Sequence, residues 1–297
     1  MHDIIKAIER GRYKYMADLK AHCELSYSHS VSVAQTAYDI GKLLQLGTQG
    51  LEKLAMCALL HDIGKATLPH DILSKPTFLT HQEQTQMMDH AKIGGQLLCS
   101  LTFCEEIRAG VAHHHEKWDG TGYPDRLKGD EIPLLSRIIA VADVFCALIA
   151  HRPYRMPATP FIAVEYIILE AGRAFDRDVV RAFCEVLKKR PSSPALTAIP
   201  ESLRLGKLTA HVRTGIVTCG GVDLYLTKKE YMLLLFFIQN RERYIKPEDL
   251  YQKVWNASME RNTNALRGAM KRLRKKIKGC GYTINNSRTE GYILERE

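Results

Sequence analysis

Histidines and aspartates recur along the first half of the chain in an order that constrains how that half can fold. They are His29, the pair His61-Asp62, His90, the run from His113 to His115, and Asp143. Imidazole and carboxylate together suit iron, manganese, zinc or nickel, whereas calcium and magnesium take oxygen ligands. The set exceeds the needs of one ion and suggests two ions bridged by a carboxylate. We therefore expect a fold that brings these side chains together.

The chain is long enough for two domains. It has 297 residues, of which 45% are hydrophobic and 25% charged, the mix of a soluble globular protein. The segment PSSPALTAIP at 191–200 is rich in proline and serine and lacks periodicity, which is typical of a linker. We predict a first domain at 1–190, a linker at 191–202 and a second domain at 203–297.

The first domain is expected to be all helical. Apolar residues recur at helical spacing from Val31 to Leu44 and again from Leu51 to Ile63. The second of these stretches delivers His61-Asp62 near its end.

The second domain has a different pattern. Residues 203–226 alternate loosely and indicate short strands. Thr227 and Glu230 form a capping box that opens a helix. Further helices are predicted from Pro247 toward Trp255 and over 263–278, with a hairpin at 282–294. This is the outline of a smaller α+β winged helix-turn-helix domain.

The formal charge of +9 lies entirely in the last third of the chain. Residues 201–297 contain 19 Lys and Arg against 10 Asp and Glu, so the remainder is balanced. A basic domain of this kind indicates binding to a polyanion.

Cysteine and hydropathy patterns favour a cytoplasmic protein. The eight cysteines include no C-x-x-C pair, and we expect reduced thiols. The N-terminus lacks the apolar core of a signal peptide. The apolar stretches are too short to span a bilayer or are interrupted by Asp143, so no membrane association is expected.

Two local patterns give the metal hypothesis chemical content. Gly64 and Lys65 follow the His61-Asp62 pair, and Lys65 places a cation where a phosphate would be held near the metals. Asp143 lies within the apolar run 138–150, where an unpaired carboxylate would be costly. Metal coordination explains Asp143 better than solvation does.

Several motifs occur in order and resemble the HD-GYP family of phosphodiesterases over residues 20–188. After His29 they are HDIGK at 61–65, KPTFLT at 75–80, His90, HHEKWDGTGYP at 114–124, RIIAVADVF at 137–145 and RPYR at 152–155. The resemblance implies an all-α HD-type helical bundle that hydrolyses cyclic di-GMP with two divalent transition metal ions, Fe or Mn.

The resemblance also implies roles for individual residues. The metal ligands would be His29, His61, Asp62, His90, His114, His115 and Asp143. Asp62 would bridge the ions and act in catalysis with Lys65, and Lys65, Arg152 and Arg155 would contact the phosphates. Gly122, Tyr123 and Pro124 would form the signature loop, which in the family is associated with partner contact and the site rim. His113 has no family role and is expected to be structural or to support the site from outside.

Two positions depart from the family pattern. Some members bind a third metal through a glutamate four residues before the first histidine, where this chain has Leu25. We therefore expect two metals and a linear dinucleotide product. Cys146 replaces an aspartate that could support the ligand shell, which weakens the expectation of high activity.

The predicted helix at 263–278 carries most of the basic charge of the second domain. Leu266, Met270, Leu273 and Ile277 form an apolar stripe, and the other faces are basic. Such a helix is often only a solvated surface. The segments LTKKEYMLLLFF, EDLYQKVW and ALRGAMKRLRKKI, with residues 288–292, resemble the OmpR-type winged-helix effector domain. That resemblance implies double-stranded DNA contacts by Arg267, Lys271, Arg272 and Arg274 in the major groove and by Arg288 on the wing.

Two functional hypotheses remain open from the sequence. The first is an active cyclic di-GMP phosphodiesterase joined to a DNA-binding regulator, which the complete ligand set favours. The second is a weak or inactive cyclic di-GMP sensor that gates DNA binding, which the fusion favours. A docking scaffold is a weaker third reading, since the charge of +9 argues against it. A homodimer and a protein contact through the signature loop are further possibilities.

Overall fold

The structure is a computed structural model that describes residues 24–73, 75, 79–100, 103–150, 159–189, 202–211, 216–255, 263–287 and 289–297. Arg152, Arg155 and Arg288, which the sequence predicts as phosphate and DNA contacts, lie outside the described residues. The chain divides into two compact units, Met1–Ala150 with Glu170–Ser193, and His151–Leu169 with Pro194–Glu297.

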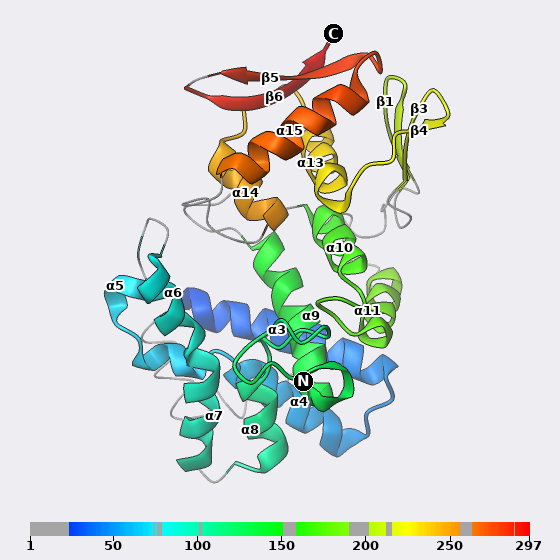
Figure 1. The fold of residues 1–297 in the computed structure, drawn as a ribbon. Helices are drawn as coiled ribbons and strands as arrows, with labels where there is room; N and C mark the ends of the chain where they lie inside the picture. Colours follow the sequence, from blue (N-terminus) through cyan, green and yellow to red (C-terminus); the bar gives the residue numbers. More distant parts are fainter. Residues whose placement is uncertain are drawn as a thin grey trace. The chain divides into compact units, whose positions relative to one another are not determined.

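The secondary structure described in the first unit is helical, as predicted, apart from an isolated bridge between Ala171 and Phe175 (Figure 1). Its α-helices are α3 (Glu24–Leu43), α4 (Thr48–Leu60), α5 (His70–Leu73), α6 (His81–Met88), α7 (His90–Ser100), α8 (Glu105–Ala112), α9 (Leu134–Ile149) and α11 (Arg177–Lys189). Two 3-10 helices, η2 (Ile63–Thr67) and η3 (Gly129–Glu131), connect them.

The core of the first unit forms where α3 packs on α4 and α9. Val33 and Ile40 of α3 and Ile138 of α9 are fully buried there. A second close approach joins η2 to α7. A Cβ on Gly64 would lie 2.0 Å from the carbonyl oxygen of His90, so only glycine fits. This contact holds the His61-Asp62 turn beside His90.

The second unit combines short antiparallel strands with helices. Its sheet has the order β1-β2-β3-β4, and β5 and β6 form a separate hairpin. The strands are β1 (Ser202–Leu205), β2 (Leu208–His211), β3 (Ile216–Cys219), β4 (Val222–Asp223), β5 (Tyr282–Ser287) and β6 (Gly291–Arg296), and the helices are α10 (Pro160–Leu169), α13 (Lys228–Gln239), α14 (Pro247–Trp255) and α15 (Thr263–Ile277). The Thr227 capping box is present: the Thr227 hydroxyl accepts from Glu230 N, and Glu230 Oε2 accepts from Thr227 N. The small strand-containing domain is confirmed.

Helix α10 packs within the second unit although it precedes the predicted linker. The Tyr231 hydroxyl of α13 donates to Glu165 Oε2 of α10 at 3.0 Å, and both side chains are buried. Lys228 Nζ also donates to the carbonyl of Leu169. The predicted boundary near residue 190 follows the order of the chain, whereas these contacts place α10 with the later residues.

Cys219 and Cys280 form a disulfide, which corrects the prediction that the thiols are all reduced. Their Cα atoms are 5.8 Å apart across a sequence separation of 61 residues. Cys219 ends β3 and Cys280 lies between two glycines after α15, and no short motif marks the pair. The prediction failed because the pairing depends on packing of distant segments. Cys57, Cys99, Cys104, Cys146 and Cys184 take part in no disulfide.

Candidate metal centre and nucleic-acid interface

Three buried imidazoles from separate helices share one mode of attachment. His61 follows α4, His90 begins α7 and His114 follows α8. In each, Nδ1 lies within hydrogen-bond distance of the carbonyl three residues earlier: 2.8 Å to Ala58, 2.5 Å to Met87 and 2.6 Å to Val111. Because a carbonyl only accepts, Nδ1 carries the proton and Nε2 keeps its lone pair. The three Nε2 atoms are buried without a hydrogen-bond partner, an arrangement typical of metal-ligating histidines.

Asp62 lies between these rings and a lysine. Its Oδ1 is 3.3 Å from His90 Nε2, and its Oδ2 is 3.5 Å from His61 Nε2 and 2.6 Å from Lys65 Nζ. Burial alone would raise the pKa of Asp62, but His61 and Lys65 outweigh it and hold the pKa well below its usual range. The side chain is therefore a carboxylate with both oxygens directed at the cluster.

Asp143 of α9 pairs with His29 of α3. His29 Nε2 is 2.8 Å and His61 Nε2 is 3.9 Å from the same oxygen, Asp143 Oδ1. Burial favours the neutral acid, yet the hydrogen bond from His29 lowers the pKa of Asp143 below its ordinary value. The packing of α3 on α9 thus gathers two predicted ligands that are 114 residues apart.

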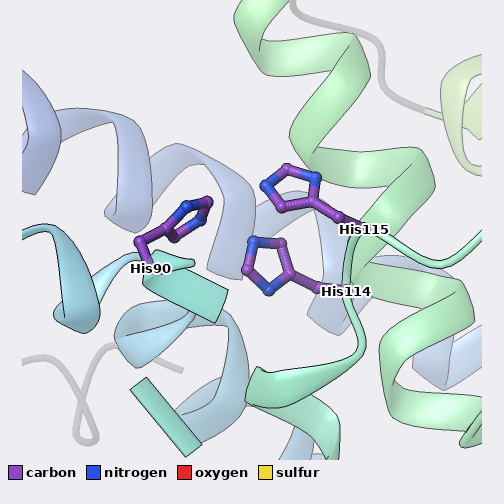
Figure 2. Close-up of side chains that lie close together, drawn as sticks. All are labelled: His90, His114 and His115. Atoms are coloured by element: carbon purple, nitrogen blue, oxygen red, sulfur yellow. The ribbon is translucent and has the colours of Figure 1, made fainter. Parts of the chain in front are cut away.

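All the predicted ligands meet in three groups whose candidate ligand atoms lie within 4.8 Å of one another. The groups are His90, His114 and His115, shown in Figure 2; His29, His61 and Asp143; and His61, Asp62 and His114. The first two groups share no member, and the third connects them. His113 belongs to none of them, because its Nε2 is 2.9 Å from Asp125 Oδ2 and its Nδ1 is 3.0 Å from the Ala109 carbonyl.

The chemistry of this cluster fits a pair of transition metal ions. Burial lowers the pKa of His61, lowers that of His114 well below its usual range, and lowers that of His115 to about 3. The imidazoles of His61, His114 and His115 are therefore neutral at pH 7, the state in which imidazole ligates metals. The carboxylates of Asp62 and Asp143 would offset part of the positive charge of two divalent ions. Buried polar atoms without a hydrogen-bond partner are rare in protein interiors. Bound metal ions would explain why these Nε2 atoms lie unpartnered beside ionised carboxylates.

Cys146 and Leu25 are the two positions that depart from the pattern of the family that the sequence resembles. Cys146 is buried, and its Sγ is 3.7 Å from Thr36 Oγ1. Leu25 lies in the first turn of α3. Neither residue is a member of the three ligand groups found among the described residues.

In the second unit, α15 buries the predicted stripe and exposes basic residues. Leu266, Met270, Leu273 and Ile277 are each 1% exposed or less, so the predicted apolar face is confirmed. Arg267 and Lys271 are exposed on the opposite side.

Two of the basic side chains predicted to contact DNA also have partners within the chain. Arg272 Nε donates to Glu230 Oε1 at 2.8 Å. Arg274 Nε donates to the Ile284 carbonyl at 2.6 Å, and its guanidinium lies 5.6 Å from the centre of the Tyr292 ring. These contacts attach α15 to α13 and to the hairpin, which the helical pattern alone did not indicate.

A basic cavity of about 440 Å³ lies where the end of α15 meets β5. Its lining residues are Arg274, Lys275, Lys278, Tyr282, Thr283 and Glu297. Sequence reasoning singled out Arg274 but not the two hydroxyl side chains, because their proximity to α15 depends on the hairpin.

The buried carboxylate of Glu230 leads to a prediction about acid stability. Desolvation raises its pKa, but hydrogen bonds from Lys276, Thr227 and Arg272 outweigh this effect and lower the pKa to about 2 from the ordinary 4.5. Because the folded-state pKa lies below the ordinary value, the ionised side chain contributes its full stabilisation above pH 4.5. That contribution is lost as the pH falls toward 2. In Glu230→Gln, the melting temperature of the second unit should therefore fall less than in wild type when the pH is lowered from about 5 to about 3.

Thermal melts of the full chain followed by circular dichroism would measure this difference. Glu290→Gln is the matched control, because Glu290 is exposed near the hairpin turn and should retain the wild-type pH dependence. A parallel fall of wild type and Glu230→Gln would contradict the assignment.

Comparisons with known proteins agree with both units. The family described as HD domain matches residues 15–179, and the family described as transcriptional regulatory protein, C terminal, matches residues 221–294. No described helix is long and apolar enough to cross a membrane.

Three curated relatives match part of the chain. The cyclic di-GMP phosphodiesterase response regulator RpfG of Xanthomonas campestris is 42% identical over 145 residues, 48% of this chain and 38% of that protein. The 3'3'-cGAMP-specific phosphodiesterase 2 of Vibrio cholerae is 35% identical over 187 residues, which cover 62% of this chain and 36% of that protein. The cyclic di-GMP phosphodiesterase PA4108 of Pseudomonas aeruginosa is 36% identical over 192 residues, which cover 63% of this chain and 45% of that protein.

The chain thus spans less than half the length of each of these relatives. The HD domain match, however, covers more than half of this chain and includes every residue of the metal cluster. Together with the helical fold and the converging His and Asp ligands, this match shows that the chain belongs to the HD domain family.

Proposed function

We propose that this protein is a metal-dependent phosphodiesterase that hydrolyses cyclic di-GMP to the linear dinucleotide, coupled to a DNA-binding regulator. The observation that carries the proposal is the convergence of His29, His61, Asp62, His90, His114, His115 and Asp143, with three buried Nε2 atoms lacking partners. The named activities of the relatives support a cyclic dinucleotide as substrate. The protein would act in the cytoplasm.

The ligand groups suggest how two ions, Fe or Mn, would be held. His29, His61 and Asp143 would bind one ion, His90, His114 and His115 the other, and Asp62 both. Bound ions of this kind lower the pKa of coordinated water and neutralise charge on phosphate oxygens.

Lys65 is the residue of the cluster best placed to act on the substrate phosphate. Its Nζ is 2.6 Å from Asp62 Oδ2, and its side chain is 27% exposed. From there the ammonium would stabilise the charge that develops on the phosphate and the departing 3' oxygen. Arg152 and Arg155 would orient the phosphodiester through forked hydrogen bonds.

A hydrolysis assay tests the enzymatic part. Full-length protein loaded with Mn²⁺ or Fe²⁺ would be incubated with cyclic di-GMP and, separately, with 3'3'-cGAMP, and the products separated by chromatography. We expect linear dinucleotide from cyclic di-GMP and no further cleavage. His113→Ala is the matched control, because this histidine neighbours the cluster but bonds Asp125 and Ala109 instead.

A sensor is the second candidate function, favoured by the C-terminal transcriptional-regulator domain. The two candidates separate in the same experiment. Tight binding of cyclic di-GMP with no product would support the sensor and reject the enzyme, and neither binding nor turnover would reject both.

For the second unit we propose a winged helix that binds double-stranded DNA through α15. Arg267 and Lys271 are exposed on the face opposite the buried stripe. Lys271, Arg267 and the wing residue Arg288 would contact DNA, and Arg272 and Arg274 would combine DNA contact with their intramolecular bonds. A homodimer and a protein partner at the signature loop remain predictions.

A DNA-binding titration over a range of salt concentrations tests this interface. The Arg267→Ala, Lys271→Ala double variant should bind a promoter-length duplex more weakly, and the slope of log affinity against log salt should fall by about one per lost phosphate contact. Lys189→Ala, an exposed lysine of α11, is the control and should bind as wild type. Equal slopes for the double variant and wild type would reject α15 as the DNA-contacting helix.

A further inference from the structure

His115 differs from the other clustered histidines in how its ring is held. The rings of His61, His90 and His114 each bond a main-chain carbonyl through Nδ1. Within the part of the chain that the structure describes, the His115 ring has no such bond. Its neighbours are the rings of His90, His114 and Tyr123, with ring centres 5.0, 4.0 and 4.9 Å away. Something other than a carbonyl must therefore set the plane of this ring.

Of these three neighbouring rings, Tyr123 is the one that is not a candidate metal ligand. Its ring stacks on His115 with an angle of 30° between the planes. His90 and His114 meet His115 at 78° and 43° and belong to the same ligand group. A stacked aromatic ring restricts rotation of the imidazole about its own side-chain bond and excludes water from one face.

The loop that carries Tyr123 is bound to the segment that carries His115. Tyr123 N donates to the His115 carbonyl at 3.3 Å, and Asp125 N donates to Glu116 Oε1 at 2.7 Å. Glu116 is only 3% exposed. The two residues on either side of Pro124 are thus both attached to consecutive residues of the other segment, so the tyrosine and the imidazole are held as one body.

Gly122 makes this close crossing possible. A Cβ at this position would lie 2.3 Å from Lys117 N and 2.5 Å from Glu116 Cα, so no other residue fits. The backbone of the loop therefore rests directly on residues 116–117, and the next side chain in the loop is directed at His115.

We propose that Tyr123 is a positioning residue for the metal centre: its ring face holds His115 in the orientation that ligates an ion. This inference rests on the proposed metal-dependent function, and it assigns the effect to the aromatic ring and not to the hydroxyl. Supporting groups around metal ligands typically change metal affinity about 10- to 100-fold when they are removed.

Metal titration of full-length variants tests the proposal without any nucleotide present. Mn²⁺ binding would be measured by calorimetry for wild type, Tyr123→Phe and Tyr123→Leu. Tyr123→Phe keeps the ring and should bind Mn²⁺ within about twofold of wild type, whereas Tyr123→Leu should weaken one of the two ions about 10- to 100-fold. The visible absorption of the Co²⁺-loaded proteins, which reports ligand geometry, should change in the leucine variant and not in the phenylalanine variant.

The outcomes separate this inference from the proposed activity. Wild-type affinity in Tyr123→Leu overturns the positioning role and leaves the phosphodiesterase proposal intact. Weak binding in both variants overturns the assignment to the ring. Metal-loaded wild type that does not hydrolyse cyclic di-GMP rejects the enzyme and not this inference, and wild type that binds no Mn²⁺ rejects both. Circular dichroism checks folding, and Tyr123→Met, which fills similar volume without a ring, replaces the leucine variant if that one unfolds.

Discussion

Replacement of Asp62 by asparagine is expected to reduce kcat/KM for cyclic di-GMP by about 10²- to 10³-fold, the loss typical when one preorganised electrostatic group is removed from a reacting centre. Asp62 is the residue whose two oxygens face His61, His90 and Lys65 at 3.5, 3.3 and 2.6 Å. The amide keeps the shape of the side chain but removes its charge and one of its acceptor atoms. Lys65 would lose its anionic partner. The two ions would lose the ligand that we propose they share.

Steady-state hydrolysis by Mn²⁺-loaded protein measures this loss, and metal analysis of the same samples should show fewer than two ions per chain. Asp125→Asn is the matched control. Asp125 is an exposed carboxylate that bonds His113 outside the ligand groups, so its variant should retain wild-type turnover and metal content. An Asp62→Asn protein with activity within tenfold of wild type would reject the bridging role.

Replacement of Cys280 by serine is expected to lower the free energy of unfolding of the second unit by up to about 4 kcal/mol, the value of the chain-entropy relation for a loop of this length. The disulfide closes a loop with a sequence separation of 61 residues and joins the end of β3 to the turn after α15. Without it, the unfolded chain gains freedom that the folded chain does not.

Urea unfolding of the full chain measures this effect, and treatment of wild type with a dithiol reductant should produce the same shift. Cys99→Ser is the control, since Cys99 is exposed and free and accepts a hydrogen bond from Arg108 that serine can retain. An unfolding midpoint that neither Cys280→Ser nor the reductant changes would show that this bond does not constrain the protein.

Much of the metal site could be predicted because ligand chemistry belongs to individual residue types. The identity of His29, His61 and Asp143 as candidate ligands needed only their side chains, their order in the motifs and the cost of burying a carboxylate. Helices could be predicted equally well, because the periodicity around Leu266 and Leu273 and the capping box at Thr227 are local patterns. The stripe and the capping box are confirmed, and the structure brings the candidate ligands together, while their role in metal binding stays a prediction.

Contacts between residues that no local pattern relates could not be predicted in this way. The Cys219–Cys280 bond, the packing of Glu165 on Tyr231, and the stacking of Tyr123 on His115 each join residues that no periodic pattern relates. The partners of Arg272 and Arg274 likewise became visible only when α15 was placed against α13 and the hairpin.

The amino-acid sequence by itself thus determined which residues are candidate metal ligands, where α13, α14 and α15 begin and which face of α15 is buried. Only the tertiary structure decided which ring orients His115, which cysteines pair and which unit holds α10. The physical reason is that local propensity and ligand chemistry act over a few neighbouring residues. Side-chain partners across 61 or 66 residues are chosen by how the helices and strands pack.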